Sequence, residues 1–357
     1  MGVRPCDYTR AVPGAHHRPE ARVDRLPGPD DLRDARELRT LARIRIEHAV
    51  PVGEPLVLVS QIQRSGGTLL SRLFDGHPEC HAHPQELKIG HPKKKHWPPI
   101  DLGRPGSWFD VLQERQVVKY RRRGAWSARE GEAERFPFLF SLRLQRALFE
   151  SCTSGREVRS ERDVLDCYFT SYFNAWLDNH NLYTGPKKVV TGFVPELAID
   201  PGNVERFFAT YPDGTLVSVV RDPRGWYVSA RRHRARYGDV ERAVGRWRES
   251  AAATLGARDG RPDRVVVVLY EDLVEDPESV MARISARVGI TMTPALLVPT
   301  FNGRPIRANS GAGAEGPGVL PERAEAWRDD LDRSTTARIS ELAGDLYERA
   351  ADAARAA

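Results

Sequence analysis

The residues from 64 to 68 are of the types that bind an oxyanion. The stretch is Arg64-Ser-Gly-Gly-Thr68, and it follows an apolar run from Pro55 to Ile62. The two glycines let the main chain approach an anion closely, Thr68 adds a hydroxyl donor, and Arg64 can donate to two oxygens at once. A helix after the loop would add backbone N–H groups and a favourable dipole. The pattern predicts a phosphate-binding loop.

Two alternative roles for this loop stay open on its sequence alone. A nucleoside-triphosphate P-loop needs the pattern G-x-x-x-x-G-K-[ST], but no Lys follows Gly67 and no Gly begins the loop. An ATPase, GTPase or kinase would therefore need an atypical loop. In the second alternative, the glycines only form a turn that joins a strand to a helix.

A second pair of anion-binding residues follows another apolar run. Residues 215 to 220 are typical of a strand, Arg221 follows them, and Ser229 comes eight residues after Arg221, in a helix that Pro223 would begin. Both side chains can meet beyond the carboxyl ends of the strands, where open α/β folds bind ligands. A surface salt bridge between Arg221 and Asp222 is the alternative role.

Together these segments resemble the two phosphate sites of sulfotransferases that use 3′-phosphoadenosine 5′-phosphosulfate (PAPS). Residues 61 to 70, with Asp-Gly-His-Pro at 75 to 78, are similar to the 5′-phosphosulfate loop, in the Arg form of the carbohydrate, tyrosyl-protein and bacterial branches. Many members have Thr where this chain has Gly67, so one hydroxyl donor is missing here. The resemblance implies that PAPS is bound by Arg64, Ser65, Gly66, Gly67, Thr68, Leu69, Arg221 and Ser229.

The resemblance extends to about Ile290 and implies two further contacts. Residues 265 to 273, and the Asp-Pro step at 276 and 277, are similar to the closing strand and helix of the family. Tyr270 in that segment either touches the nucleotide or is a half-buried strand tyrosine. The Asn-Ser-Gly-Ala-Gly stretch from 309 to 313 is similar to the lid that folds over PAPS, which implies Ser310 as a contact.

The segment from 77 to 87, which follows the helix expected after the phosphate-binding loop, contains the residues that can remove a proton from an acceptor. Sulfuryl transfer is an in-line displacement, so a base must deprotonate the acceptor and a cation must stabilise the departing phosphate. Arg64 suits the second task. The resemblance places Glu86 where the Arg-type branches carry a glutamate base, with His83 as the alternative base and His81 third. A loop histidine bonded to backbone is an equally good interpretation of His83.

The same segment raises the question of a metal, because His77, His81 and His83 lie close together in the sequence. We expect no metal, since the family uses none. In addition, no Cys or carboxylate pair completes a set of four ligands.

Basic residues elsewhere are candidates for binding an anionic acceptor. Lysines 93 to 95, Lys119 and arginines 121 to 123 either line an acceptor groove or form a solvated surface. Lys188, just before a predicted strand, is a candidate for contacting the bridging oxygen of the donor.

An α/β fold must position these residues. Apolar runs alternate with helical patterns, which predicts a parallel, doubly wound sheet. Together with the resemblance, this implies a P-loop-like fold of three layers with a central parallel sheet flanked by helices. Strands are expected at 55–62, 189–193, 215–221 and 264–270, and helices at 32–48, 163–179, 203–211 and 223–256.

The predicted organisation is one main domain with a short extension. Residues 1–31 lack an apolar period and are expected to form a flexible arm. Residues 32–357 are expected to form a single domain, with an acceptor-side insertion at about 87–187 and a C-terminal helix at about 321–356. Within the insertion, residues 91–106 and 113–129 are expected to be loop with poor core content.

The composition sets the remaining limits. The chain has 357 residues, of which 40% are hydrophobic, enough for one substantial core. A net charge of +5 permits an anionic ligand without requiring nucleic acid, and we expect no nucleic-acid partner. No apolar stretch is long enough for a membrane span and no secretory segment is present, so we expect a cytoplasmic protein without an integral membrane segment. The cysteines at 6, 80, 152 and 167 form no C-x-x-C pair and are predicted to be free thiols.

The sequence thus predicts a sulfotransferase that moves the sulfuryl group of PAPS to a hydroxyl or amine of an acceptor, such as a carbohydrate, a glycolipid or a small metabolite. Two alternatives remain. One is a nucleotide-dependent kinase with an atypical phosphate loop, and the other is a non-catalytic nucleotide-binding module of the same fold.

Overall fold

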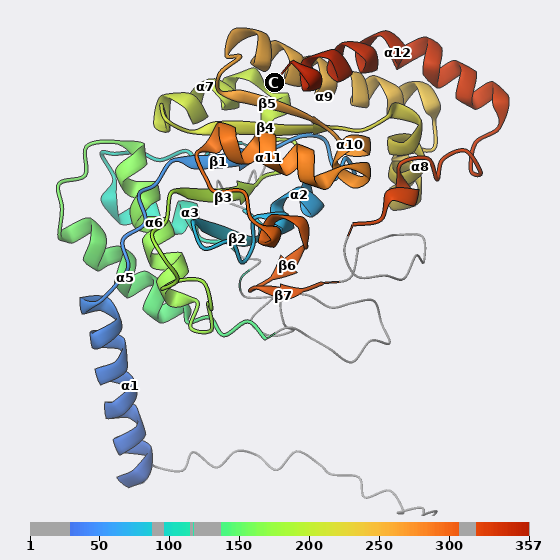
Figure 1. Ribbon diagram of the computed structural model, residues 1–357. Coiled ribbons are helices and arrows are strands. Elements are labelled where there is room, and N and C mark those ends of the chain that lie inside the picture. The colour runs from blue at the N-terminus through green and yellow to red at the C-terminus, as the bar shows by residue number, and fades with distance from the viewer. Residues whose placement is uncertain (1–28, 88–95, 115–116, 118–136, 307–318, 357) are drawn as a thin grey trace, which may run out of the picture. The chain divides into compact units, whose positions relative to one another are not determined.

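The structure is a computed structural model that describes residues 29–87, 96–114, 117, 137–306 and 319–356 (Figure 1). The chain divides into two compact units, residues 1–44 and residues 45–357. The helices are α1 (Pro29–Glu47), α2 (Gly67–Leu73), α3 (Trp108–Leu112), α5 (Leu142–Ser154), α6 (Glu161–Ala175), α7 (Pro201–Thr210), α8 (Pro223–His233), α9 (Val240–Gly260), α10 (Tyr270–Glu275), α11 (Pro277–Val288) and α12 (Arg333–Arg355). The strands are β1 (Leu56–Val59), β2 (Cys80–Glu86), β3 (Val189–Phe193), β4 (Thr215–Val220), β5 (Val265–Leu269), β6 (Thr300–Phe301) and β7 (Arg304–Pro305).

A five-stranded parallel sheet in the order β2-β3-β1-β4-β5 forms the centre of the second unit. Four of its strands coincide closely with the apolar runs predicted from the sequence, because a strand buried on both faces is apolar at nearly every position. The parallel sheet flanked by helices is therefore confirmed. Since all five strands run the same way, the loops that follow them emerge at one edge, called here the carboxyl edge.

Two apolar clusters cover the two faces of the sheet and give the three layers. In the first, Val57, Val217 and Val266 pack with residues of α2, α10 and α11. In the second, Val267 and Leu269 pack with residues of α8, α9 and α12. Helices α9 and α12 contact each other along the second face (Figure 1).

The strand β2 was not predicted. Its sequence, Cys-His-Ala-His-Pro-Gln-Glu, contains no β-branched residue, yet all but its last residue are buried. It pairs in parallel with β3, with His81 opposite Val190 and Glu86 opposite Phe193. Burial beneath neighbouring elements, and not intrinsic propensity, makes this segment a strand.

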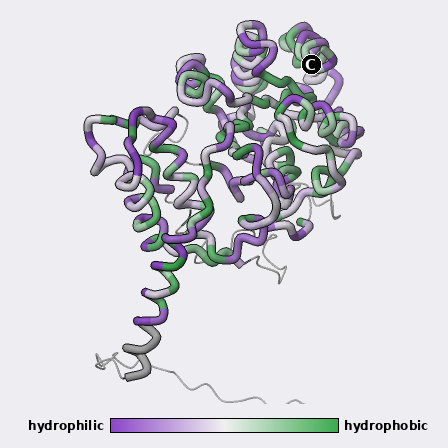
Figure 2. Tube along the Cα trace, turned by 60° about the vertical axis from the view of Figure 1, so that its left-hand side comes forward, coloured by the Kyte–Doolittle hydropathy of each residue, from purple (hydrophilic) through white to green (hydrophobic). Residues whose placement is uncertain are grey.

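The amphipathic helix predicted at 32–48 is present as α1. Hydrophilic and hydrophobic residues alternate along it (Figure 2). Its apolar residues Leu38, Leu41 and Ile44 recur at intervals of three and are exposed. Residues 1–28 of the predicted arm lie outside the described residues.

Two predicted helices have different bounds in the structure. The helix predicted at 223–256 is two helices, α8 and α9, because the side chain of Asp239 accepts from the backbone N–H of Arg242 and begins a new helix. The C-terminal helix begins at Arg333 and not near residue 321. Asp332 caps the start of this helix, because its side chain accepts from the backbone N–H of Thr335.

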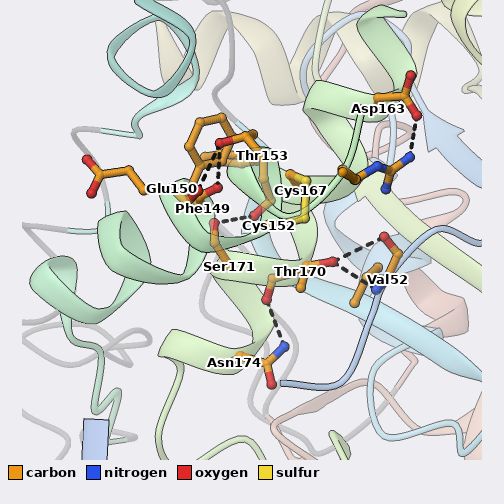
Figure 3. The surroundings of a disulfide bond; sticks show 12 residues. Val52, Phe149, Glu150, Cys152, Thr153, Asp163, Cys167, Thr170, Ser171 and Asn174 are labelled. Carbon is orange, nitrogen blue, oxygen red and sulfur yellow. Dashed lines mark hydrogen bonds and ion pairs between the residues drawn. A yellow bond between two sulfur atoms is a disulfide. The ribbon is translucent and has the colours of Figure 1, made fainter. Parts of the chain in front are cut away.

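The prediction of free thiols was wrong for two cysteines. Cys152 of α5 and Cys167 of α6 form a disulfide (Figure 3), with 5.6 Å between their Cα atoms. No sequence pattern indicated this bond, because the two residues are 15 positions apart and become neighbours only when α5 packs against α6. Cys80 is a free, buried thiol whose pKa burial raises to about 12. Cys6 lies outside the described residues.

The helical hairpin of α5 and α6 is also tied to the segment that leads into β1. Thr170 Oγ1 accepts from the backbone N–H of Val52 at 2.9 Å (Figure 3), and Asn174 Oδ1 accepts from the backbone N–H of Val50 at the same distance. The hairpin therefore belongs to the same packed body as the sheet.

The insertion expected at about 87–187 contributes residues to the core, including Trp97 and Ile100 within the stretch from 91 to 106 that was expected to have poor core content. In the described part of the insertion, Trp97, Trp108, Phe109 and Leu112 are all buried. The indole N–H of Trp97 donates to the Glu161 carboxylate at 3.1 Å, which joins this stretch to the start of α6. Among the described residues, no helix combines the length and apolar character that crossing a membrane requires.

Candidate active site

The loop between β1 and α2 has an unusual backbone. Arg64 has φ of 73° and Gly66 has φ of 102°, so both lie in the left-handed region. A non-glycine residue is conformationally strained there, and such residues concentrate at ligand sites. Gly66 is also required by its surroundings, because a Cβ at this position would lie 2.5 Å from Cδ2 of Tyr270.

Residues far apart in the sequence meet at this loop. The guanidinium of Arg64 donates from Nε to Ser229 Oγ at 3.0 Å, and Arg221 donates from Nη1 to the Arg64 carbonyl at 3.2 Å. The Arg221 guanidinium lies over the ring of Tyr270, 4.2 Å from its centre. The loop after β1, the Arg and Ser after β4 and the Tyr after β5 therefore form one site at the carboxyl edge.

The site concentrates positive charge. Burial and the nearby Arg221 cation both lower the pKa of Arg64. The guanidinium groups of Arg64 and Arg221 repel each other, and an anion bound beside both would relieve the repulsion.

Buried polar atoms near the loop have no hydrogen-bond partner within the part of the chain that the structure describes. They include Ser65 Oγ, Gln63 Oε1 and both amide atoms of Gln61. Buried polar groups in folded proteins are nearly always hydrogen-bonded. These atoms are therefore available to the polar groups of a ligand.

Glu86 ends β2 and so reaches the same edge. Strand β3 separates β2 from β1, which puts Glu86 two strand spacings, roughly 10 Å, to the side of β1. His233, at the end of α8, lies within electrostatic range of both Arg64 and Glu86. Burial and the Arg64 cation lower the pKa of His233, and the Glu86 carboxylate opposes that change. Sequence reasoning missed His233, because nothing distinguishes it within the arginine-rich run from 231 to 236.

A comparison with family models matches residues 55–294 to the model described as the sulfotransferase family. The chain belongs to this family. No curated protein matches its sequence.

Solved structures with a similar chain path include three bacterial sulfotransferase proteins. The sulfotransferase domain from the curacin biosynthetic pathway is 18% identical, with a TM-score of 0.45, over 83% of this chain and 99% of that one. The sulfotransferase domain from the Synechococcus PCC 7002 olefin synthase is 21% identical, with a TM-score of 0.43, over 82% of this chain and 95% of that one. Sulfotransferase STF9 from Mycobacterium avium is 16% identical, with a TM-score of 0.40, over 90% of this chain and 84% of that one.

His83 of this sulfotransferase-family chain is a buried member of a polar network. Its Nε2 lies 3.0 Å from Glu114 Oε1 and its Nδ1 lies 2.9 Å from the Gln85 carbonyl. Its ring packs against Tyr172, with 4.6 Å between ring centres. Glu114 also accepts from the hydroxyl of Tyr168 at 3.0 Å. Glu114 was missed because it borders a basic stretch that was expected to be a loop.

The other two histidines are apart from the carboxyl edge. His81 is buried near the start of β2 against the ring of Phe173, and burial lowers its pKa to about 3. His77 bonds through Nε2 to the Thr291 carbonyl at 2.9 Å. Among the described residues, no three side chains of His, Cys, Asp or Glu gather to hold a metal ion.

The suggestion for Lys188 was wrong. This residue precedes β3, so it lies at the amino end of the sheet, opposite the carboxyl edge. There, its ammonium pairs with Glu79 Oε1 at 2.7 Å. The last two residues of the predicted phosphate-binding stretch, Thr68 and Leu69, lie in the first turn of α2. Thr68 is exposed, and Leu69 packs against the first apolar cluster.

Several other predictions concern residues outside the described part of the chain. They are Ser310, lysines 93 to 95, Lys119 and arginines 121 to 123.

Proposed function

We propose that this chain is an enzyme that transfers the sulfuryl group of PAPS to a hydroxyl or amine of an acceptor, such as a carbohydrate, a glycolipid or a small metabolite. The observation that carries the proposal is the convergence of Arg64, Ser229 and Arg221 at one edge of the sheet. A site with two adjacent cations suits a nucleotide that is phosphorylated at both ends. Membership of the sulfotransferase family supports the same reaction class.

The residues present fit the phosphate groups of such a nucleotide. The Ser65 hydroxyl is buried and, among the described residues, without a partner, and the loop closes tightly around the Gly66 backbone. When bound, PAPS would supply an activated sulfuryl group with a phosphate as leaving group. The proposed contacts are Arg64, Ser65, Gly66, Gly67, Thr68, Leu69, Arg221, Ser229 and Tyr270, with Ser310 proposed from the sequence alone.

In the proposed mechanism, Glu86 takes the proton from the acceptor hydroxyl and Arg64 stabilises the charge that develops on the leaving phosphate. In this proposal the acceptor lies between Glu86, at the end of β2, and Arg64, in the loop after β1. Nε2 of His83 is engaged with Glu114 and Nδ1 with the Gln85 carbonyl, which favours Glu86 over His83 as the base. His83 then serves to position β2.

The proposed surroundings of the enzyme rest on the sequence. We propose a cytoplasmic location, no bound metal and no nucleic-acid partner. The modest net charge of +5 supports the last point.

A thermal-shift screen followed by a turnover assay tests the proposed function. Adenosine 3′,5′-bisphosphate at 100 times its Kd should stabilise the chain by about 2.7 kcal/mol, and ATP with Mg²⁺ should not. Stabilisation by ATP with Mg²⁺ alone would instead indicate a kinase. Labelled PAPS with a pooled acceptor library should give labelled product. Binding of the bisphosphate without any turnover would indicate a non-catalytic module.

A further inference from the structure

Gln61 occupies the space that a side chain at position 67 would fill. A Cβ on Gly67 would lie 1.9 Å from Nε2 of Gln61 and 2.6 Å from Cε2 of Phe193. No other residue type fits at 67 while the Gln61 amide stays in place. The amide of Gln61 is therefore held directly against the backbone of the anion-binding loop.

The amide group of Gln61 is buried without a partner. The residue is 2% exposed, and neither Nε2 nor Oε1 has a hydrogen-bond partner among the described residues. The backbone is fixed, because the Gln61 carbonyl accepts from the backbone N–H of Glu196 at 2.8 Å. A buried amide without a partner destabilises a folded protein, whereas an apolar side chain of the same shape does not.

The surroundings of this amide indicate what its partner would be. Arg64 follows Gln61 by three residues and lies beside Arg221, and the hydroxyl of Ser65 is also buried without a partner among the described residues. Two cations and a free hydroxyl donor favour an anionic oxygen at this place. An amide N–H donates to such an oxygen without adding charge.

We propose that Gln61 is a further binding residue of the site. Its amide, which takes the place that a side chain at 67 would fill, donates an N–H to the anionic group held by residues 64 to 68. This inference rests on the proposed function and identifies that group as the 5′-phosphate end of the nucleotide. The opposing hypothesis is that Gln61 only fills space between Gly67 and Phe193.

Two variants that conserve shape separate these hypotheses. Gln61→Met keeps the length of the side chain and removes the amide, and Gln61→Glu keeps the shape and adds a negative charge. Gln145→Met is the matched control, because Gln145 is 1% exposed, has an amide nitrogen without a partner among the described residues, and belongs to α5, which contributes nothing to the site.

The experiment is calorimetric titration of the full-length chain with adenosine 3′,5′-bisphosphate and with adenosine 3′-monophosphate, which lacks the 5′ group. Gln61→Met should weaken binding of the bisphosphate roughly tenfold, and Gln61→Glu should weaken it more. Both variants should bind the 3′-monophosphate within about twofold of the unchanged chain. The Gln145→Met control should bind both ligands as the unchanged chain does.

The outcomes are distinguishable. Equal affinity of Gln61→Met and the unchanged chain for the bisphosphate overturns the inference and leaves the proposed function standing. An equal loss for both ligands also overturns it, because a space-filling role disturbs the whole site. Failure of the unchanged chain to bind the bisphosphate overturns the proposed function and this inference with it. If Gln61→Met does not fold, Gln61→Glu carries the same comparison.

Discussion

Two clusters of buried polar side chains lie on neighbouring parts of the same sheet and differ in one respect. Between β2 and α6, His83 uses both ring nitrogens and Glu114 accepts from His83 and Tyr168. At the loop after β1, the side chains of Ser65 and Gln61 have no partners within the described residues, and two arginines lie together.

We propose that the difference separates a structural role from a binding role. A buried network whose members are all bonded rigidifies the fold and gains nothing from a ligand. A buried cluster with unused donors, like charges and a left-handed backbone lowers stability until a ligand compensates it. We therefore expect changes in the first cluster to lower stability and changes in the second to lower ligand binding or turnover.

The largest expected effect is on turnover, from Glu86→Gln. Removal of a general base slows a reaction by about 100- to 10,000-fold. The affinity for adenosine 3′,5′-bisphosphate should stay within about twofold, since the glutamine keeps the shape of the side chain. Single-turnover assays with labelled PAPS measure the first quantity and calorimetry the second. Full turnover by this variant would place the base elsewhere.

The second prediction concerns the hairpin of α5 and α6, whose helix α6 contributes Tyr168 to the hydrogen-bonded cluster of His83 and Glu114. Replacing Cys152 and Cys167 by serine opens a loop of 15 residues and should lower the free energy of unfolding by about 3 kcal/mol. Binding of the bisphosphate should not change. Denaturant unfolding with and without ligand measures both. Loss of ligand binding together with stability would contradict the separation of the two regions.

The same disulfide also bears on the proposed cytoplasmic location, because reducing compartments rarely keep such bonds. Alkylation of thiols at the moment of cell lysis, followed by mass spectrometry, shows whether the bond exists in the cell. A protein with both thiols alkylated would contradict the disulfide under those conditions.

The third prediction concerns Arg221, where, in contrast to the disulfide, we expect ligand binding to fall and stability to stay nearly constant. Arg221→Ala should weaken binding of the bisphosphate by about 10- to 150-fold, because hydrogen bonds to charged groups contribute about 1.5 to 3 kcal/mol. The free energy of unfolding without ligand should change little, since the variant also removes repulsion with Arg64. Titration and denaturant unfolding test the two halves separately.

The fourth prediction uses pH to detect the energetic cost of the site. Glu271 interacts electrostatically with Arg221 and accepts from the backbone N–H of Asp222 at 3.1 Å and from the Tyr347 hydroxyl at 3.0 Å. Burial raises its pKa from 4.5 to about 7. The folded state therefore binds more protons than the unfolded state between these values. Its contribution to stability is complete below pH 4.5 and is lost as the pH rises to about 7.

Glu271→Gln removes this dependence. The variant should gain about 2 kcal/mol in unfolding free energy relative to the unchanged chain between pH 5 and pH 8. Denaturant unfolding at both pH values measures the change. A constant difference between the two proteins across this range would show that Glu271 titrates normally.

The smallest expected effect comes from Lys188→Ala. Because this lysine pairs with Glu79 at the amino end of the sheet, kcat/KM for PAPS should stay within about twofold. A large loss would show that Lys188 acts on the donor after all.

Much of the site could be predicted from the sequence because its components are local. The apolar runs at β1, β3, β4 and β5 indicate buried parallel strands by composition alone. The glycines and Arg64 follow directly after one of these strands, and the Arg221 and Ser229 pair follows another. A parallel sheet then brings its carboxyl ends together, so the meeting of the two segments also followed from the sequence.

Only the tertiary structure decided which distant residues are neighbours. The polar segment from 80 to 86 becomes a strand because other elements bury it, and that burial engages His83 with Glu114. The bond between Cys152 and Cys167 and the filling of the space at Gly67 by Gln61 likewise depend on packing. Local propensity depends on adjacent residues, whereas these contacts arise from side-chain shape and burial in the folded chain, which no short stretch of sequence contains.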